Sequence, residues 1–384
     1  MRFIHTADWH LGRLFHGVHL TEDQALVLDQ IHDLMKSADA DALIVAGDVY
    51  DRAVPPVDAV RLLDDFLSRV GIGLGKQVVM IAGNHDSPDR LGFGSRVLAQ
   101  GGLHMISAVD QAIPCITLKD GHGPVKVYAL PFTEPSVLNE KIEGLAARDH
   151  QGVMTALVQR VWDNHPKGAR SLLTAHAFVI DCEETESERP LSLGGADRVA
   201  ASCLDGFDYV ALGHLHKPQR AGSETVRYSG SLLKYSFGET QQEKVVLVVD
   251  MDERGDCRIE AVPIKPRRDV RRIEGHMKEL LERPGEFGNT DDYLLVRLLD
   301  KGAILDVMRK LRDVFPNALH VERPHLEIKG RTGGAEEDPR GKSDSRLFGD
   351  FFFEVTGEPL SDAQRTAYES IAHRLRVEDR ETAA

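Results

Sequence analysis

The chain has 384 residues, and its 47 Lys and Arg against 61 Asp and Glu give it a formal net charge of −14. Because this charge repels polyanions, any anionic partner needs a local basic surface or bound cations. Hydrophobic residues make up 42% and charged residues 28% of the chain, which excludes a largely disordered or fibrous protein. At this length, more than one domain is expected.

No secretory leader or bilayer-length apolar run is visible in the sequence. The four cysteines lie far apart and form no CxxC pair, which favours reduced thiols over a disulfide framework or a cysteine zinc site. The sequence therefore predicts a cytoplasmic protein without a membrane segment.

Up to about residue 250, short β-branched apolar runs alternate with segments of helical period, a pattern typical of an α/β layered domain. Helices are predicted at Glu22–Lys36 and Asp58–Val70, each with an apolar face. The predicted strands are Arg2–Ala7, Ala42–Ala46, Gln77–Ala82, Val125–Leu130, Ser171–Ala175, Asp208–Leu212, Val226–Ser229 and Lys244–Asp250.

Three further segments are predicted after this main domain, which is assigned residues 1–265. Residues 266–329 form a small α+β unit, in which the helices Gly275–Glu282 and Ile304–Phe315 accompany the strands Asp292–Leu299 and Leu319–Glu322.

Residues 330–346 are rich in Gly and charge, so they are predicted to be a flexible linker. Residues 347–384 are predicted to form a helical tail, with Ser361 as an N-cap. Its exposed aromatic residues favour docking onto a partner, and a helix folded back on the body is the alternative. These residues are Phe348, Phe351, Phe352 and Phe353.

Five polar motifs stand at the carboxyl ends of predicted strands, where the loops of an α/β sheet converge. In chain order they are Asp8-Trp9-His10, Gly47-Asp48, Gly83-Asn84-His85-Asp86, Ala175-His176 and Gly213-His214-Leu215-His216. Their side chains are oxygen donors and imidazoles without a thiolate, which suits divalent cations such as Mn²⁺, Mg²⁺, Fe²⁺ or Zn²⁺.

The spacing within these motifs has a physical reason. Residues two apart along an extended segment point the same way, so Asp8 with His10, and His214 with His216, can each approach one site. Asp48 is suited to bridge two cations about 3.5–4 Å apart.

Taken singly, each motif is weak evidence. His176 alone is more often a satisfied imidazole, and Asn84 is equally suited to a turn. Gly47, Gly83 and Gly213 mark strand exits where the backbone is expected to turn sharply and to stay close to the metals. The joint occurrence of the motifs, each after a strand, favours a metal site.

In this order the motifs resemble the signature of the calcineurin-like metallophosphoesterases. Longer stretches are similar to the SbcD family of bacterial nuclease subunits, closely as far as Pro266 and more loosely beyond it. These stretches are HTADWHLGR (5–13), GDVYDRAVPP (47–56), GNHDSPDRL (83–91), SERPLSLGG (187–195), GHLHKPQ (213–219) and YSGSLLKYSFGE (228–239).

The resemblance implies a four-layer α/β sandwich, in which two mixed sheets are flanked by helices. It implies that the α+β unit is a cap controlling DNA access, and that the tail docks on the coiled-coil ATPase SbcC. It also implies a homodimer formed by the nuclease domains.

The resemblance also implies the site residues. One metal ion would be held by Asp8, His10, Asp48 and His216, and the other by Asp48, Asn84, His176 and His214. His85 would be the catalytic residue that handles a proton. Two Mn²⁺ ions are expected, with Mg²⁺ as the alternative.

The leading hypothesis is a two-metal DNA nuclease acting in repair, recombination and replication, both as a double-strand 3′–5′ exonuclease and as a single-strand and hairpin endonuclease. The alternatives are a metallophosphodiesterase for a small-molecule phosphoester and a non-catalytic scaffold. A protein phosphatase is disfavoured, since that branch usually carries Glu where this chain has Asp86.

Several residues near the motifs have two interpretations. Trp9 and Arg13 either contact DNA or pack beside the site, and Asp51 and Arg52 are expected to form a local ion pair. A basic stretch either contacts DNA phosphates or is solvated. It comprises Lys265, Arg267, Arg268, Arg271 and Arg272.

Overall fold

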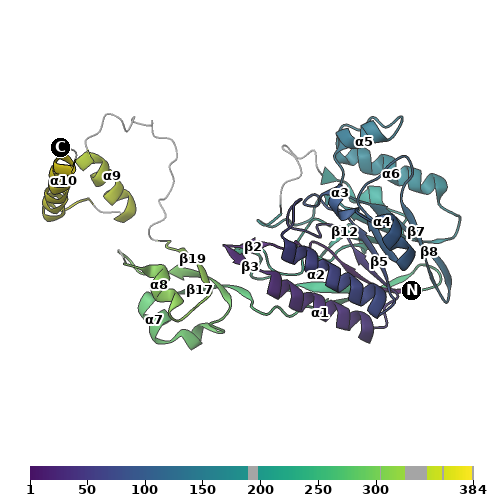
Figure 1. Ribbon diagram of the computed structural model, residues 1–384, viewed down its shortest axis with the longest axis horizontal. Helices are drawn as coiled ribbons and strands as arrows, with labels where there is room; N and C mark the ends of the chain where they lie inside the picture. Colours follow the sequence, from purple (N-terminus) through teal and green to yellow (C-terminus); the bar gives the residue numbers. More distant parts are fainter. Residues whose placement is uncertain (189–197, 303, 325–343, 357–358, 383–384) are drawn as a thin grey trace. The chain divides into compact units, whose positions relative to one another are not determined.

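The structure is a computed structural model that describes residues 1–188, 198–302, 304–324, 344–356 and 359–382 (Figure 1). The chain divides into two compact units, Met1–Val270 and Arg271–Ala384. The larger unit contains two six-stranded sheets, and the smaller unit contains a three-stranded sheet with helices.

The first sheet of the larger unit comprises β1 (Arg2–Thr6), β4 (Ala42–Val45), β5 (Gln77–Ile81), β6 (Leu103–Ile106), β15 (Val245–Met251) and β16 (Cys257–Pro263), in the order β16-β15-β1-β4-β5-β6. The neighbouring strands β1, β4, β5 and β6 pair in parallel, whereas β15 pairs antiparallel with β1 and with β16. β4 is buried throughout, which explains its continuous apolar sequence.

The second sheet comprises β7 (Cys115–Asp120), β8 (Gly123–Leu130), β9 (Arg170–His176), β12 (Tyr209–Gly213), β13 (Gln219–Ala221) and β14 (Ser223–Tyr228), in the order β13-β14-β12-β9-β8-β7. The four central strands are parallel, and β7 and β13 are antiparallel edge strands. Both sheets are therefore mixed.

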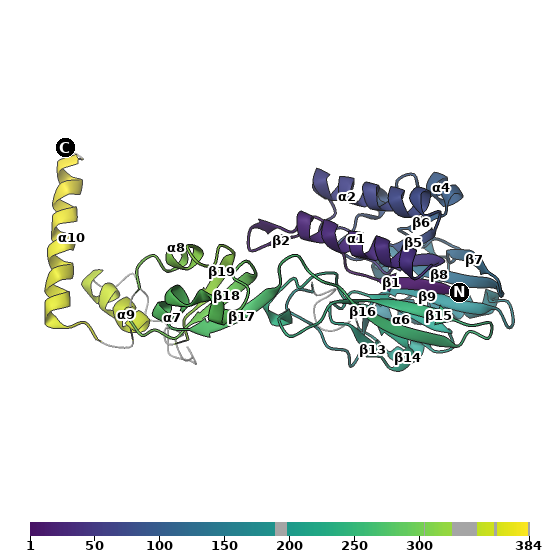
Figure 2. The same cartoon turned by 90° about the horizontal axis from the view of Figure 1, so that it is seen from below.

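The two sheets pack face to face through one apolar core. Phe3 and Ile44 of the first sheet pack with Leu172 and Tyr209 of the second, and the rings of Phe3 and Tyr209 meet edge to face at 5.3 Å. Helices α1 (Thr21–Ser37) and α2 (Val57–Ser68) lie along the first sheet (Figure 2).

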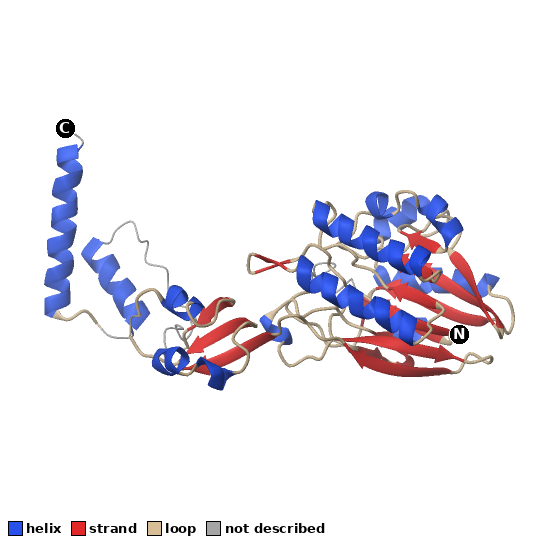
Figure 3. Cartoon of the chain, turned by 60° about the horizontal axis from the view of Figure 1, so that its bottom comes forward, coloured by secondary structure: helices blue, strands red, loops and turns tan. Residues whose placement is uncertain are grey.

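Helices cover the face of the second sheet that is turned away from the first sheet. Helices α5 (Pro135–Lys141) and α6 (His150–Asn164) belong to this layer, and α6 contributes Leu157 and Val161 to a core shared with Leu173 and Val210. Helix, sheet, sheet and helix succeed one another, and the predicted four-layer α/β sandwich is confirmed (Figure 3).

Short elements connect these layers. They are the hairpin β2 (Leu14–Phe15) and β3 (Val18–His19), the helices α3 (Pro88–Leu91) and α4 (Ser95–Leu98), and the parallel pair β10 (Phe178–Val179) and β11 (Arg198–Val199). The helix predicted to end at Val70 ends at Ser68 and continues as a π-helical turn, Arg69–Gly73. The four edge strands of the two sheets, β6, β7, β13 and β16, are not among the predicted strands, because polar or charged residues interrupt their partly exposed sequences.

The smaller unit has the predicted α+β character. Its sheet has the order β17-β18-β19, and the elements are β17 (Val270–Gly275), α7 (Met277–Glu282), β18 (Tyr293–Leu298), α8 (Val307–Arg312) and β19 (Ala318–Glu322). Leu280, Val296 and Phe315 lie in its core. α8 begins later than predicted, after Asp306, whose backbone has a left-handed φ of 55°.

The tail consists of α9 (Asp344–Thr356) and α10 (Asp362–Thr382). The predicted N-cap is present, since the backbone amide of Gln364 donates to Oγ of Ser361 at 3.4 Å. Of the predicted linker, residues 330–343 lie outside the described part, and the remainder belongs to α9.

The expectation that all four tail phenylalanines are exposed is wrong for Phe348 and Phe352, which are half-buried. The ring of Phe348 stacks on Tyr368 of α10, with centroids 4.1 Å apart, because the two helices pack on each other. Phe353 is exposed, and the side chain of Phe351 lies outside the described residues. In the described part of the chain, no helix has the length and apolar character needed to cross a membrane.

Candidate metal centre

The five polar motifs lie in the last residues of β1, β4, β5, β9 and β12 or directly after them, and their side chains meet at the carboxyl ends of these strands. All seven predicted ligands lie in this one cluster. Asn84 is half-buried, and the buried ones are Asp8, His10, Asp48, His176, His214 and His216. The cluster therefore lies at the end of the sandwich, with its donors shielded from water.

One half of the cluster is formed by His10, His216 and Asp48. The Nε2 atoms of His10 and His216 lie 3.0 Å apart, and Nε2 of His10 lies 3.7 Å from Oδ2 of Asp48. The rings of His10 and His85 meet edge to face with centroids 4.6 Å apart, so His85 lies directly beside this half.

The other half is formed by Asn84, His176 and His214. Oδ1 of Asn84 lies 2.9 Å from Nε2 of His176 and 3.3 Å from Nδ1 of His214. Nε2 of His176 lies 3.5 Å from the same Oδ2 of Asp48 that faces His10. Asp48 is therefore shared by both halves, as its predicted bridging role requires.

Asp8 lies between strand ends rather than beside His10 alone. Its carboxylate accepts from the backbone amide of His214 at 2.9 and 3.1 Å, and Oδ1 lies 3.9 Å from Nδ1 of His176. Asp8, Asp48 and His176 together offer three donor atoms close enough to surround one cation.

The donor set fits cations. Burial lowers the pKa of His10, His176 and His214, so these imidazoles are neutral and keep a lone pair. Burial, and then the charge of Asp48, raises the pKa of Asp8. Nδ1 of His10 is buried with no hydrogen-bond partner among the described residues. Facing lone pairs and crowded carboxylates repel one another, and a cation between them would remove that repulsion.

The backbone at the site is strained. Asp8, His10 and Asp48 have left-handed φ values of 53°, 46° and 47°, and His214 has a φ of 110°. Non-glycine residues at such angles cluster at functional sites, where the surrounding structure holds them in place. These four strained residues all belong to the cluster of predicted ligands.

The glycines before the motifs are required for two different reasons. Gly47 has a φ of 94°, and a Cβ there would lie 2.2 Å from Nδ1 of His176. A Cβ on Gly83 would lie 2.1 Å from Oδ1 of Asp48, although its backbone angle is ordinary. Gly83 is thus required for close approach rather than for a sharp turn, which corrects the expectation for that position.

Asp86 is a functional residue whose role the sequence did not reveal. Its carboxylate accepts from the amides of Val49 and Tyr50 at 3.0 and 2.9 Å and from the amide of Gly83 at 2.9 Å. Burial, and then the charge of Asp48, raises the pKa of Asp86 to about 7. Asp86 therefore holds the loops after β4 and β5 together behind the ligands.

Two expectations concern residues near His85. The expected ion pair between Asp51 and Arg52 is present at 3.7 Å, and Asp51 pairs more closely with Arg13, at 3.0 Å. Trp9 is fully buried and donates to Thr6 Oγ1, so it is a packing residue and not a DNA contact. Nδ1 of His85 lies 2.8 Å from the carbonyl oxygen of Asp51, a contact that leaves Nε2 for a reacting group.

Part of the basic stretch is neutralised within the chain. Arg267 pairs with Glu22, and Arg271 pairs with Asp292 at 2.6 Å. These two ion pairs disfavour an interpretation in which all the charges of the stretch face DNA.

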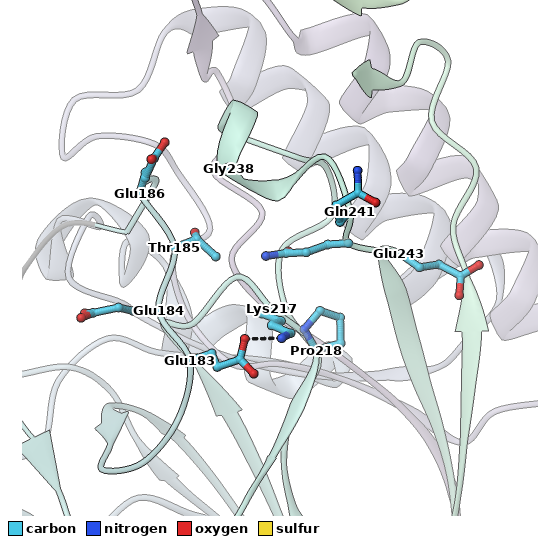
Figure 4. A pocket seen from close by; sticks show the side chains of 10 residues that line it. Glu183, Glu184, Thr185, Glu186, Lys217, Pro218, Gly238, Gln241 and Glu243 are labelled. Carbon is cyan, nitrogen blue, oxygen red and sulfur yellow. Dashed lines mark hydrogen bonds and ion pairs between the residues drawn. The ribbon is translucent and has the colours of Figure 1, made fainter. Parts of the chain in front are cut away.

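A polar pocket of about 510 Å³ is lined by residues that include none of the predicted metal ligands (Figure 4). Its lining comes from the segment 183–186, from Lys217 and Pro218, and from the segment 238–243. Four glutamates and one lysine line it, and Lys217 pairs with Glu183. This excess of negative charge disfavours a DNA backbone in the pocket.

Comparison with known proteins places the chain in a family. The family described as calcineurin-like phosphoesterase matches residues 1–218, and one described as type 5 capsule protein repressor C-terminal domain matches residues 266–356. The chain is 30% identical over 371 residues to SbcD, a subunit of the nuclease SbcCD, from Staphylococcus saprophyticus, with 97% of each chain covered.

Solved structures with similar folds are more distant. A protein from Thermus thermophilus is 17% identical, with 68% of this chain and 98% of that chain covered and a TM-score of 0.39. A dimetal phosphatase from Danio rerio is 14% identical, with 69% and 99% covered and a TM-score of 0.41. From the family match and the full-length relative, the chain belongs to the calcineurin-like phosphoesterases and, within them, to the SbcD family of nuclease subunits.

Proposed function

We propose that this protein is the nuclease subunit of an SbcCD-type complex and hydrolyses DNA phosphodiesters at a centre of two divalent cations. The observation that carries the proposal is the position of Asp48 Oδ2, which lies 3.7 Å from Nε2 of His10 and 3.5 Å from Nε2 of His176. A carboxylate shared in this way is what a two-cation site needs.

The ligand sets follow the two halves of the cluster. One cation is held by Asp8, His10, Asp48 and His216, and the other by Asp48, Asn84, His176 and His214. Asp8 also contacts the second half, through the amide of His214, and a carboxylate between two cations can support both. The oxygen and imidazole donors are suited to Mn²⁺, with Mg²⁺ as the weaker alternative.

Bound cations would neutralise phosphate oxygens and lower the pKa of a water molecule for in-line attack on phosphorus. The chain itself supplies the orientation. His85 is held through Nδ1 by the carbonyl of Asp51 at 2.8 Å, so its Nε2 is directed away from that contact. From there an imidazole protonated on both nitrogens can stabilise developing negative charge or donate its Nε2 proton to the leaving sugar oxygen.

The substrate is DNA, cleaved as a 3′–5′ exonuclease on duplex ends and as an endonuclease on single strands and hairpins. This activity suits roles in repair, recombination and replication, and we expect the protein to act in the cytoplasm, at the nucleoid. The support is the similarity over nearly the full length to a protein named as a nuclease subunit.

Two partners complete the proposal. The first is an SbcC-type ATPase, bound by the helical tail, where Phe353 remains exposed after Phe348 has stacked on Tyr368. The second is another copy of the chain. Val57 on α2 and Phe93 after α3 are exposed by 63% and 86%, and burying such side chains against a second copy would be favourable.

The deciding experiment compares blunt duplex, hairpin and single-stranded DNA with a chromogenic phosphodiester, with and without Mn²⁺ and with and without the ATPase partner and ATP. We expect cleavage of DNA that a chelator abolishes and Mn²⁺ restores. Turnover of the chromogenic ester without cleavage of any DNA would instead support a small-molecule phosphodiesterase. No metal-dependent turnover of either would support a scaffold.

A further inference from the structure

A buried chain of polar contacts lies behind His216. Oγ of Ser187 lies 2.5 Å from Nδ1 of His216 and 2.5 Å from Oε1 of Glu239. Ser187 begins the SERPLSLGG stretch and Glu239 ends the YSGSLLKYSFGE stretch, and neither stretch supplies a proposed metal ligand. The fold brings Ser187 and Glu239 together at one imidazole.

The direction of these hydrogen bonds follows from the charge on Glu239. Its Oε2 lies 2.6 Å from Nζ of Lys244, and both side chains are buried, so Glu239 is an ionised acceptor. The single hydroxyl proton of Ser187 is therefore donated to Glu239. Oγ of Ser187 must then accept from His216, which places a proton on Nδ1 and a lone pair on Nε2.

That lone pair points to the metal centre, since Nε2 of His216 lies 3.0 Å from Nε2 of His10. The backbone of His216 is held as well. Its amide donates to Oε1 of Glu188 at 2.6 Å, and its carbonyl accepts from Nζ of Lys244 at 2.8 Å. The ring of His216 is thus fixed by the buried Ser187, and its peptide by the half-buried Glu188 and the buried Lys244.

We propose that Ser187 and Glu239 are positioning residues that hold His216 in its Nδ1-protonated form, ready to bind a cation through Nε2. The inference rests on the proposed metal site. The Nδ1 atom of His216 is held by a side chain, whereas Nδ1 of His176 lies 2.9 Å from the backbone carbonyl oxygen of Ala46. At His216, by contrast, a side chain performs this task and can be removed by substitution.

The test measures Mn²⁺ binding to the full chain by calorimetry and by the electron paramagnetic resonance spectrum of the bound ion. Ser187→Ala should weaken one of two Mn²⁺ sites by about 10–100-fold, as removal of a group that orients a metal-binding histidine typically does. The melting temperature in EDTA should stay close to that of the unaltered protein. Excess Mn²⁺ should restore most of the nuclease activity.

Ser236→Ala is the matched control. Oγ of Ser236 also donates to Oε1 of Glu239, at 3.2 Å, but it has no described contact with His216. This variant should bind Mn²⁺ as the unaltered protein does. An equal loss in both serine variants would overturn the proposal, because it would assign the effect to Glu239 packing alone.

Glu239→Gln completes the test and remains decisive if Ser187→Ala does not fold, and the double variant is added where both single variants fold. Glu239→Gln should weaken the same site, and the double variant should lose no more affinity than the worse single variant. Additive losses, or two unaltered sites in Ser187→Ala or Glu239→Gln, would overturn the positioning role while leaving the two-metal proposal intact. An unaltered protein that binds no Mn²⁺ would overturn both.

Discussion

The backbone amide of His85 donates to Oδ1 of Asp48 at 2.9 Å, which joins the loop after β5 to the loop after β4. The hydrogen bond fixes Oδ1 of the shared carboxylate against a backbone amide, and Oδ2 is left facing His10 and His176. It also requires a close approach of the two chain segments, which Gly83 allows.

Gly83→Ala should therefore disrupt the metal centre. The new Cβ would lie 2.1 Å from Oδ1 and 2.3 Å from the amide nitrogen of Asp48, and neither atom can move without breaking the loop contact. We expect the free energy of unfolding to fall by about 1–3 kcal/mol, as for other overpacked sites. Mn²⁺ binding, measured by calorimetry, should be lost.

Gly73→Ala is the control for this substitution. A Cβ at Gly73 would meet no heavy atom within 4 Å. Since alanine restricts the unfolded chain more than glycine, stability should be unchanged or rise by up to about 1 kcal/mol. Retained Mn²⁺ binding in Gly83→Ala would show that the close approach is not needed.

His85→Ala and Asp48→Ala should fail in different ways. His85 is not among the proposed ligands, so its removal should leave both Mn²⁺ ions in place, as elemental analysis would show. The rate of DNA cleavage should fall by about 10²–10⁴-fold, the usual range for a lost proton-transfer group. Asp48→Ala should lose metal occupancy as well as activity. Full nuclease activity in His85→Ala would remove this residue from the mechanism.

The sequence was sufficient to predict which residues gather at the site, because each polar motif follows an apolar strand and parallel strands end at one edge. It could not show how they are held. Ser187 and Glu239 lie 52 positions apart, and only the packed fold brings them to His216. The carboxylate of Asp86 accepts hydrogen bonds from two backbone amides in the loop after β4. The spacing of residues in the sequence does not reveal this contact.

The same limit applies to the fold. Buried central strands such as β4 were predictable from continuous apolar runs, whereas β16 was not. It is an edge strand, and its partly exposed sequence reads as polar. Phe348 looked like a free docking residue because its stacking partner, Tyr368, lies on the next helix.

A buried ion pair should make stability fall in acid. Hydrogen bonds from Arg170, at 2.9 and 2.5 Å, lower the pKa of Asp120 below its ordinary value. Its stabilising contribution is thus complete above an ordinary aspartate pKa of about 3.9 and is lost as pH falls through the lower folded value. Asp120→Asn should cost about 3–5 kcal/mol near neutral pH, because it leaves a buried arginine without its charge partner.

Urea unfolding in EDTA measures this effect. The difference between the unaltered protein and Asp120→Asn should shrink as the pH falls below about 3. Asp250→Asn is the matched control, since Asp250 pairs with Arg2 at 2.6 Å but both side chains are exposed. It should cost less than about 1 kcal/mol. A constant difference between the Asp120 variant and the unaltered protein across this range would exclude the proposed linkage.

The exposed apolar residues of the nuclease unit should mediate self-association. Phe93 is 86% exposed, and Val97 and Val57 are 73% and 63% exposed, so water contacts most of these side chains in a single copy. Burying them between two copies would be favourable, because each square ångström of apolar surface removed from water contributes about 25 cal/mol. Phe93→Asp would instead place two like charges in such an interface.

We therefore expect the unaltered protein to sediment as a dimer and Phe93→Asp as a folded monomer. Leu305→Asp is the matched control, because Leu305 is 80% exposed but belongs to the smaller unit. It should remain dimeric, and both variants should melt close to the unaltered protein, since neither side chain contributes much to a core. A dimer that survives Phe93→Asp would place the interface elsewhere on the chain. A monomeric unaltered protein would refute the homodimer itself.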